Sequence, residues 1–312
     1  MIVCVAGNPS IDRLFEVDHL RVGDIHWPSA FVALPGGKGL HVAQVATVLG
    51  GEATATGILA GHAGRWIAET LAAEGVAGRF AWGPGETRSC LSVADRATGG
   101  LTEFYEAGTP AGEPEWEALA EIVGSLLDGA RWLALSGSLP PQTPDDGYAQ
   151  LIAAARRAGV AAAVDSRGRW LAHAVDAGPE LVKINAFEAR ELLGAPIEDL
   201  AQAREAADAA RALAGGDGHA VVITLGEDGM VLVDPAGRAW RGAAPARGAY
   251  PVGSGDAFLG GLLAGLDAEQ AWPEATRLAL GAASANAEVP GAARLRAARA
   301  RELAAAAQLV EW

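Results

Sequence analysis

The stretch "VGSGDAF" places a carboxylate, Asp256, directly behind a turn of Gly253, Ser254 and Gly255, where an apolar, helix-like run begins. The first N–H groups of a helix have no partner within it, and the helix dipole adds about half a positive charge there. The N–H groups of residues 253 to 256 could therefore stabilise a phosphoryl group in transfer, while Asp256 accepts the proton of the attacking hydroxyl. The same residues would also suit an Asp that simply caps a helix after a tight turn.

A second motif, "NAFE", places Asn185 and Glu188 one helical turn apart just after the strand-like run "LVKIN". An amide and a carboxylate in this arrangement can order magnesium-bound waters beside a nucleotide. Taken alone, the pair is better explained as an N-cap Asn followed by an acidic third helical residue.

Two further motifs end strand-like runs. "TLGEDG", from Thr224 to Gly229, joins two such runs and is compatible with a plain hairpin turn. "SGSLPP", from Ser136 to Pro141, brings two hydroxyls and two prolines to a strand end, and a simple loop would also explain it. Because ligands of open α/β sheets bind beyond the carboxyl ends of the strands, both motifs are candidates for a site.

The glycine-rich stretch "PGGKG" is not a phosphate-binding loop of the Walker type. Val32 stands where that motif needs its first Gly, and Gly39 where it needs Ser or Thr. The first strand runs into "AGNPSID", so the dinucleotide-binding pattern G-x-G-x-x-G is missing too. Both absences argue against a P-loop enzyme and against a nicotinamide-dependent oxidoreductase.

Lysine and asparagine are rare in this chain, because almost all positive charge is carried by Arg. The complete set is Lys38, Lys183, Asn8, Asn185 and Asn286. Four of the five lie in short, motif-like stretches that are interrupted by Gly or Pro. We interpret these residues as retained for function, although chance placement is the simpler alternative.

Composition restricts the class of protein. The 312 residues are 50% hydrophobic, which is ample for a large α/β domain, and the net charge of -14 speaks against nucleic acid or an anionic membrane as a partner. No apolar run approaches the roughly 20 residues that span a bilayer. Two cysteines, Cys4 and Cys90, have no metal-binding spacing, which favours the reducing cytoplasm.

The elements that must position these motifs alternate between strand and helix. We expect strands at 2–6, 52–60, 131–137, 160–165, 181–185 and 220–226, and helices at 37–50, 64–75, 115–127, 144–159, 186–194, 204–215, 256–266, 271–287 and 293–309. This alternation predicts a parallel sheet covered by helices on both faces. Residues 12–34 and 87–106 instead show period-two alternation around turns, which predicts two β-ribbons that form a lid over the crevice.

Taken together and in this order, "NPSID", "PGGKG", "TRS", "SGSLPP", "VDS", "LVKINAFE", "TLGEDG", "VGSGD" and "SANA" resemble the ribokinase-like (PfkB) carbohydrate kinases. The resemblance is nearest to the branch of 1-phosphofructokinase and tagatose-6-phosphate kinase. It implies an ATP- and magnesium-dependent kinase that forms one domain over residues 1–312. It also implies a three-layer α/β/α core with a mainly parallel sheet, and a lid from about 12–34 and 87–106 through which a homodimer could form.

The resemblance also implies a role for each matching residue. Asp256 would be the base, with Gly253, Ser254 and Gly255 as the anion hole. The nucleotide would contact Lys183, Asn185, Glu188, Thr224, Gly226, Gly229 and Asn286, and Asn185 and Glu188 would hold magnesium through water. The acceptor sugar or sugar phosphate would contact Asp12, Gly36, Gly37, Lys38, Arg88 and Ser138, together with His41, His26 and Trp27 at substituted positions.

Departures from the family pattern concentrate in the acceptor half. Where the branch usually has Asn and Arg on the first helix, this chain has His41 and Gln44. The usual Asn-Arg pair of the lid is His26-Trp27, and the usual Asn of "TR-x-N" is Cys90. The motifs expected to bind the nucleotide match the family pattern almost completely. We therefore expect that the protein transfers a phosphoryl group, to an acceptor that need not be fructose 1-phosphate.

Other acceptors and other classes of protein remain open at this point. His41, Trp27 and Tyr105 would suit a flatter or less charged acceptor, such as a free sugar or a nucleoside, besides tagatose 6-phosphate and fructose 6-phosphate. Lys38 and Arg88 indicate that an anion is recognised, unless they are merely solvated in loops. A non-catalytic sugar or nucleotide sensor on the kinase fold is a further alternative, but a sensor would not need the base.

Overall fold

The computed structural model describes residues 1–312, and a twisted sheet of eleven strands forms its centre. Ten strands follow the order β15-β14-β13-β12-β11-β10-β9-β1-β4-β5, and β6 pairs with β4. The strands are β1 (Ile2–Ala6), β4 (Ala53–Ala60), β5 (Ala77–Gly78), β6 (Ala81–Gly83), β9 (Trp132–Ser136), β10 (Ala161–Asp165), β11 (Leu181–Asn185), β12 (Ala220–Thr224), β13 (Met230–Val233), β14 (Ala239–Gly242) and β15 (Leu309–Glu311). Pairing is parallel from β12 to β5 and antiparallel from β12 to β15, so the predicted parallel sheet is confirmed with an antiparallel edge.

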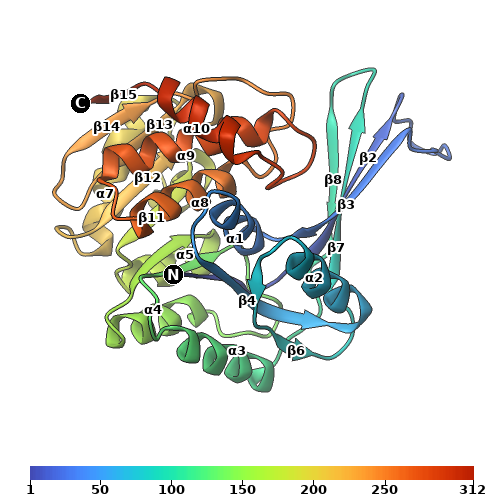
Figure 1. The fold of residues 1–312 in the computed structure, drawn as a ribbon, viewed down its shortest axis with the longest axis horizontal. Coiled ribbons are helices and arrows are strands. Elements are labelled where there is room, and N and C mark those ends of the chain that lie inside the picture. The colour runs from blue at the N-terminus through green and yellow to red at the C-terminus, as the bar shows by residue number, and fades with distance from the viewer.

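Helices cover both faces of this sheet (Figure 1). One face carries α1 (Lys38–Val48), α2 (Gly61–Ala73), α8 (Ser254–Asp267), α9 (Trp272–Ala287) and α10 (Ala297–Ala306). The other carries α3 (Glu113–Leu126), α4 (Gly147–Arg157), α5 (Gly168–Asp176), α6 (Ala186–Leu193) and α7 (Leu200–Ala214). Successive side chains of β1 alternate between the two cores: Ile2 and Cys4 pack in the first, Val3 and Val5 in the second. The predicted three-layer architecture is therefore confirmed.

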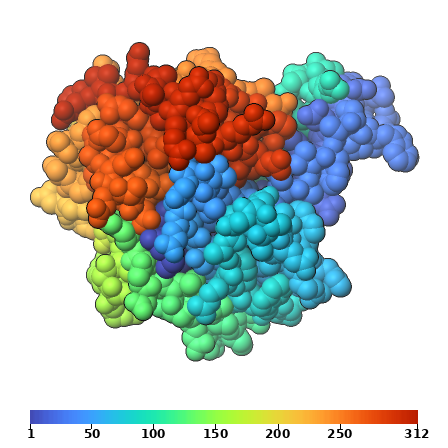
Figure 2. All heavy atoms as spheres, viewed as in Figure 1, coloured from blue at the N-terminus to red at the C-terminus, as the bar shows by residue number.

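A separate four-stranded sheet, the lid sheet, contains β2 (Ser10–Val17), β3 (Ala30–Gly36), β7 (Arg88–Asp95) and β8 (Leu101–Tyr105). Its order is β3-β2-β7-β8, with β2 and β7 parallel and both outer pairs antiparallel. The two ribbons predicted at 12–34 and 87–106 thus pair with one another. Figure 2 shows their blue and teal atoms as a lobe that stands out from the body of the molecule.

Some predicted boundaries were wrong. The helix expected over 144–159 begins only at Gly147, because Asp146 occupies the N-cap position. The helix expected over 293–309 spans Ala297–Ala306, since Ala293 has a left-handed backbone. After α10 the backbone becomes extended, and β15 pairs with the free edge of β14. The local sequence pattern did not predict this pairing. No helix is long and apolar enough to cross a membrane.

Candidate active site

The carboxyl ends of the central strands open into one cavity of about 600 Å³, a volume typical of small-ligand sites. The strand register aligns the ends of β9 and β10, where Ser136 pairs with Asp165, and the ends of β11 and β12, where Asn185 pairs with Thr224. The cavity lining includes these residues predicted from sequence: Asp12, Gly37, Lys38, His41, Arg88, Ser138, Lys183, Asn185, Glu188, Thr224, Gly226, Gly229, Gly253, Ser254, Gly255 and Asp256. The fold therefore brings together motifs that lie far apart in the chain.

Four predicted residues lie outside the cavity lining. Gly36 lies behind Asp12, and any side chain there would overlap the Asp12 carboxylate. His26 and Trp27 lie in the segment that joins β2 to β3, where the Trp27 side chain is 88% exposed. Within one chain, these two residues do not reach the cavity.

Asn286 of α9 is the fourth, and it is fully buried behind the glycine turn. Its Nδ2 donates to the Val252 carbonyl at 2.9 Å and lies 3.2 Å from the hydroxyl of Ser254. Its Oδ1 accepts the N–H of Ala293 at 2.8 Å. Asn286 therefore stabilises the turn from behind, whereas it was expected to contact the nucleotide.

The glycine turn leads directly into α8. Gly253 is the N-cap and has φ of 78°, a left-handed conformation that favours glycine. A Cβ at this position would overlap the side chain of Ala292 and lie 3.0 Å from its Cα. Asp256 lies in the first turn of α8 and is 7% exposed. The N–H of Ser254 donates to the Pro251 carbonyl at 3.1 Å, so the unpaired N–H groups that meet the carboxylate at the cavity wall are those of Gly255 and Asp256.

His41 of α1 lies between two carboxylates. Its Nδ1 is 2.8 Å from Oδ2 of Asp256, and its Nε2 is 3.5 Å from Oδ2 of Asp12. Burial would lower the pKa of the imidazole, but hydrogen bonding and attraction to both carboxylates outweigh burial and raise the pKa to about 10. Asp12 also accepts the hydroxyl of Ser10 at 2.6 Å. From the sequence, His41 was expected to contact the acceptor; its position beside Asp256 is visible only in three dimensions.

A buried ion-pair network joins the two halves of the site. The carboxylate of Asp165, which ends β10, accepts Lys38 Nζ at 2.5 Å and Lys183 Nζ at 2.7 Å. Lys38 also lies 2.9 Å from Oε1 of Glu188. Burial alone would raise the pKa of Asp165, but the two ammonium groups hold it below its ordinary value. Burial alone would lower the pKa of Lys38, but its carboxylate neighbours raise it.

Asp165 is the member of this network that the sequence analysis left without a role. Its position at the end of a strand beside "SGSLPP" and "LVKIN" was the available signal. Lys38 is not simply solvated in a loop, because it forms two ion pairs.

Asn185 and Glu188 both cap the start of α6 and line the cavity. Asn185 is the N-cap of α6: its Oδ1 accepts the N–H of Glu188, while Glu188 Oε2 accepts the N–H of Asn185, each at 2.9 Å. The plain capping explanation therefore holds. Both side chains nevertheless line the cavity, and each Glu188 oxygen has one protein donor and thus a spare lone pair.

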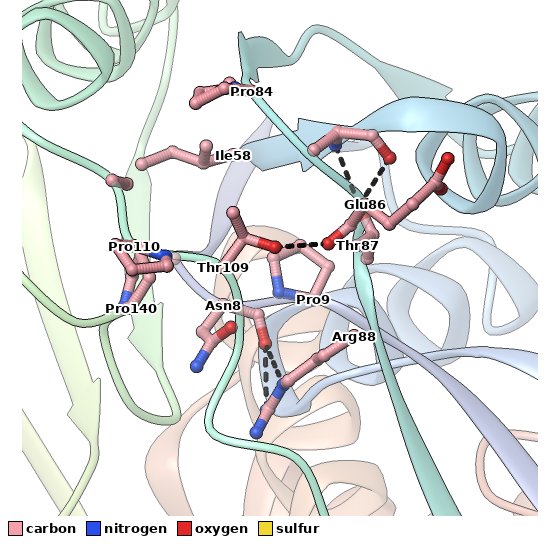
Figure 3. Close-up of a pocket in the computed structure, with 14 residues that line it drawn as sticks. Asn8, Pro9, Ile58, Pro84, Glu86, Thr87, Arg88, Thr109, Pro110 and Pro140 are labelled. Carbon is pink, nitrogen blue, oxygen red and sulfur yellow. Dashed lines mark hydrogen bonds between the residues drawn. The ribbon is translucent and has the colours of Figure 1, made fainter.

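Arg88 fixes the base of the lid sheet. Its Nε and Nη2 donate to the carbonyl of Asn8 at 3.2 and 2.9 Å, and its Nη1 donates to the carbonyl of Glu106 at 2.9 Å. Figure 3 shows this guanidinium below a small hollow of about 20 Å³, where the hydroxyl of Thr109 donates to the carbonyl of Glu86. The hollow has room for about one water molecule and is too small for a substrate.

Comparison with known proteins agrees with this geometry. The chain is 33% identical over 287 residues to the 1-phosphofructokinase of Rhodobacter capsulatus, covering 90% of each chain. It is 29% identical to phosphofructokinase-2 from Escherichia coli in complex with substrates and products, with a TM-score of 0.88 and 98% of each chain covered. A Thermotoga maritima structure with a TM-score of 0.90 is 19% identical, covers 100% of this chain and 99% of its own, and shows the shared fold alone.

The three-layer core with its separate small sheet is the ribokinase-like fold, and the chain is a phosphotransferase. Residues 2–298 match the pfkB family carbohydrate kinase, so the chain belongs to the pfkB family of carbohydrate kinases. Kinases of this family use ATP. The expectation of a kinase is confirmed, and the oxidoreductase alternative is wrong.

Proposed function

We propose that the protein transfers the γ-phosphoryl group of ATP to a hydroxyl of a sugar phosphate, with fructose 1-phosphate as the first candidate acceptor. The observation that carries this proposal is the meeting of Asp256, the glycine turn and Asp12 in one cavity. The 1-phosphofructokinase relative from Rhodobacter capsulatus supports the choice of acceptor.

Each part of the site has a definite task in this reaction. Asp256 accepts the proton of the attacking hydroxyl, and the free N–H groups at the start of α8 stabilise the charge on the transferred phosphoryl group. Asp12 holds acceptor hydroxyls. Lys183 lies beside Gly255, whose added Cβ would be 2.9 Å from Nζ, so its ammonium group is placed to neutralise a phosphate at the turn.

The residues present also fit magnesium held through water. No group of three His, Cys, Asp or Glu side chains could hold a metal, so a site built from such side chains alone is not available. Magnesium commonly keeps several waters and binds through one or two carboxylates together with substrate phosphates. Asn185 and Glu188 would hold those waters, and the ion would supply charge neutralisation at the phosphates of ATP.

A different acceptor is the second candidate within the same family. Lys38 is ion-paired with two carboxylates, and Arg88 donates three hydrogen bonds to two carbonyls, so each cation has only part of its donors left for an acceptor phosphate. This observation favours a less charged acceptor, such as a free sugar or a nucleoside. Arg167, an exposed cation on the cavity wall with no ion pair, is the group that could still bind the phosphate of fructose 1-phosphate, fructose 6-phosphate or tagatose 6-phosphate.

The lid sheet suggests how copies of the chain could associate. Several large apolar side chains of the lid segments are exposed: Val22, Ile25, Trp27, Phe31, Phe104 and Tyr105. We propose that they contact a second copy in a homodimer of single-domain chains. Such a contact would also give His26 and Trp27 an acceptor-binding role that they cannot have within one chain.

The test is ADP release with magnesium-ATP across fructose 1-phosphate, fructose 6-phosphate, tagatose 6-phosphate, free hexoses and nucleosides. We expect turnover of one acceptor that depends on Asp256 and persists in the Asp208→Asn control, which alters an exposed carboxylate of α7. Turnover of a nucleoside or free hexose alone would select the second candidate. Absence of Asp256-dependent turnover on every acceptor would contradict the proposal and favour a sensor.

A further inference from the structure

His41 has an unusual environment for a histidine. It lies in the first turns of α1 with its side chain 6% exposed, and both ring nitrogens face carboxylates from different elements, Asp12 of β2 and Asp256 of α8. The other charged groups nearby are Lys38 on the same helix and Arg88 of β7, which contribute to the electrostatics of Asp256 and Asp12 respectively.

The two contacts define the protonation state. A neutral imidazole has one N–H donor and one lone pair, so one carboxylate would face a lone pair in a buried space. A doubly protonated ring can donate to both. Nε2 lies 3.5 Å from Oδ2 of Asp12, which is within ion-pair distance but outside the usual hydrogen-bond geometry, and no other group bonds to it. Its charge also offsets part of the negative charge that two neighbouring carboxylates would otherwise leave uncompensated.

The contact also orients Asp256. Since Oδ2 is engaged by His41 at 2.8 Å, Oδ1 remains as the oxygen that can take a proton from an acceptor hydroxyl. Asp12, at the other end of the imidazole, belongs to the lid sheet. His41 therefore connects the predicted base on the core to the predicted acceptor-binding carboxylate on the lid.

We propose that His41 is a positioning residue that acts as a protonated bridge at neutral pH, fixing Asp256 and Asp12 relative to one another for phosphoryl transfer. This proposal rests on the proposed function and deepens it. The bridge distinguishes this chain from the usual pattern of its branch, where an amide occupies the position and can donate from one nitrogen only.

The first test does not need activity. Nuclear magnetic resonance of ¹⁵N-histidine-labelled protein at pH 8 reports the protonation of each ring nitrogen, and His41→Asn or His41→Gln identifies the resonance by its loss. Both nitrogens of His41 are expected to be protonated at pH 8, because two carboxylates face the ring. A neutral His41 at pH 8 would overturn the proposal whether or not the protein is a kinase.

The second test uses the best acceptor from the panel. His41→Asn is expected to lower kcat at least about tenfold, because the base loses its fixed orientation. It should also move the acid limb of the pH profile of kcat/KM to higher pH. The reason is that the pKa of Asp12, which burial raises, is held below its ordinary value mainly by His41.

His173→Asn, the same substitution on another helix, is the matched control and should leave both kcat and the pH profile unchanged. A purely structural role would lower stability without moving the acid limb. Wild-type kcat and an unmoved acid limb in His41→Asn would therefore contradict the positioning role. Lack of turnover in the wild type would instead count against the proposed function, and the resonance experiment would still decide the bridge.

Discussion

Replacement of Asp165 by Asn tests the buried network most severely. Asp165 has no exposed surface, and it pairs with Lys183, which is itself only 2% exposed. The variant leaves Lys183 buried without a counter-charge, whereas Lys38 retains Glu188. Breaking a buried ion pair by removing one partner costs about 3–5 kcal/mol, and we expect the lower end because Asn can still accept one hydrogen bond.

The expected loss of about 3 kcal/mol corresponds to a fall in Tm of roughly 5 °C for a chain of this size. Differential scanning calorimetry at pH 7.5 measures it. Asp208→Asn is the matched control, because it removes the same charge from an exposed pair with Arg204 and should cost less than about 1 kcal/mol. Adding Lys183→Met to Asp165→Asn should cost less than the sum of the two single changes. Equal small losses in both Asp→Asn variants, or strict additivity with Lys183→Met, would refute this reasoning.

Two further predictions concern the turn and the histidine. Gly253→Ala should lower Tm and reduce kcat more than about tenfold, because it combines a left-handed backbone with overlap on Ala292. Gly124→Ala, in the last turn of α3 with open space around it, is the control and should be neutral or stabilising. Equal effects of the two substitutions in calorimetry and turnover would contradict this. Because the pKa of His41 rises from 6.5 to about 10 on folding, its stabilisation is full below pH 6.5 and is lost as pH rises through 10. The difference in unfolding free energy between wild type and His41→Asn should therefore shrink from pH 6.5 to pH 10 in urea titrations, and a constant difference would show that the folded His41 is not charged.

Most helices and strands of the fold could be predicted from local sequence patterns. Strand and helix periods depend on neighbouring residues, so the alternation that builds the parallel sheet was readable from the chain. The pairing of β15 with β14 was not, because it joins residues about seventy positions apart through a short exposed segment. The left-handed backbone at Ala293, which shortens α10, also has no signature in its own residue type.

The same distinction between local and long-range information applies to the residues of the site. The position of the glycine turn and Asp256 at the start of a helix was predictable, because it depends only on adjacent residues. Asp165 was not, since its importance comes from Lys38, 127 positions away, and from Lys183 on a neighbouring strand. The buried position of Asn286 likewise depends on how α9 packs behind the turn. Family resemblance supplied roles for residues, but contacts between motifs required three dimensions.

The most direct test of the central claim is turnover by Asp256→Asn on the best acceptor, measured beside the binding of magnesium-ATP by calorimetry. We predict that kcat falls by at least about a hundredfold while the Kd for magnesium-ATP changes less than about threefold, because the side chain serves the chemical step. Turnover close to wild type in this variant, with nucleotide binding intact, would contradict the assignment of Asp256 as the base.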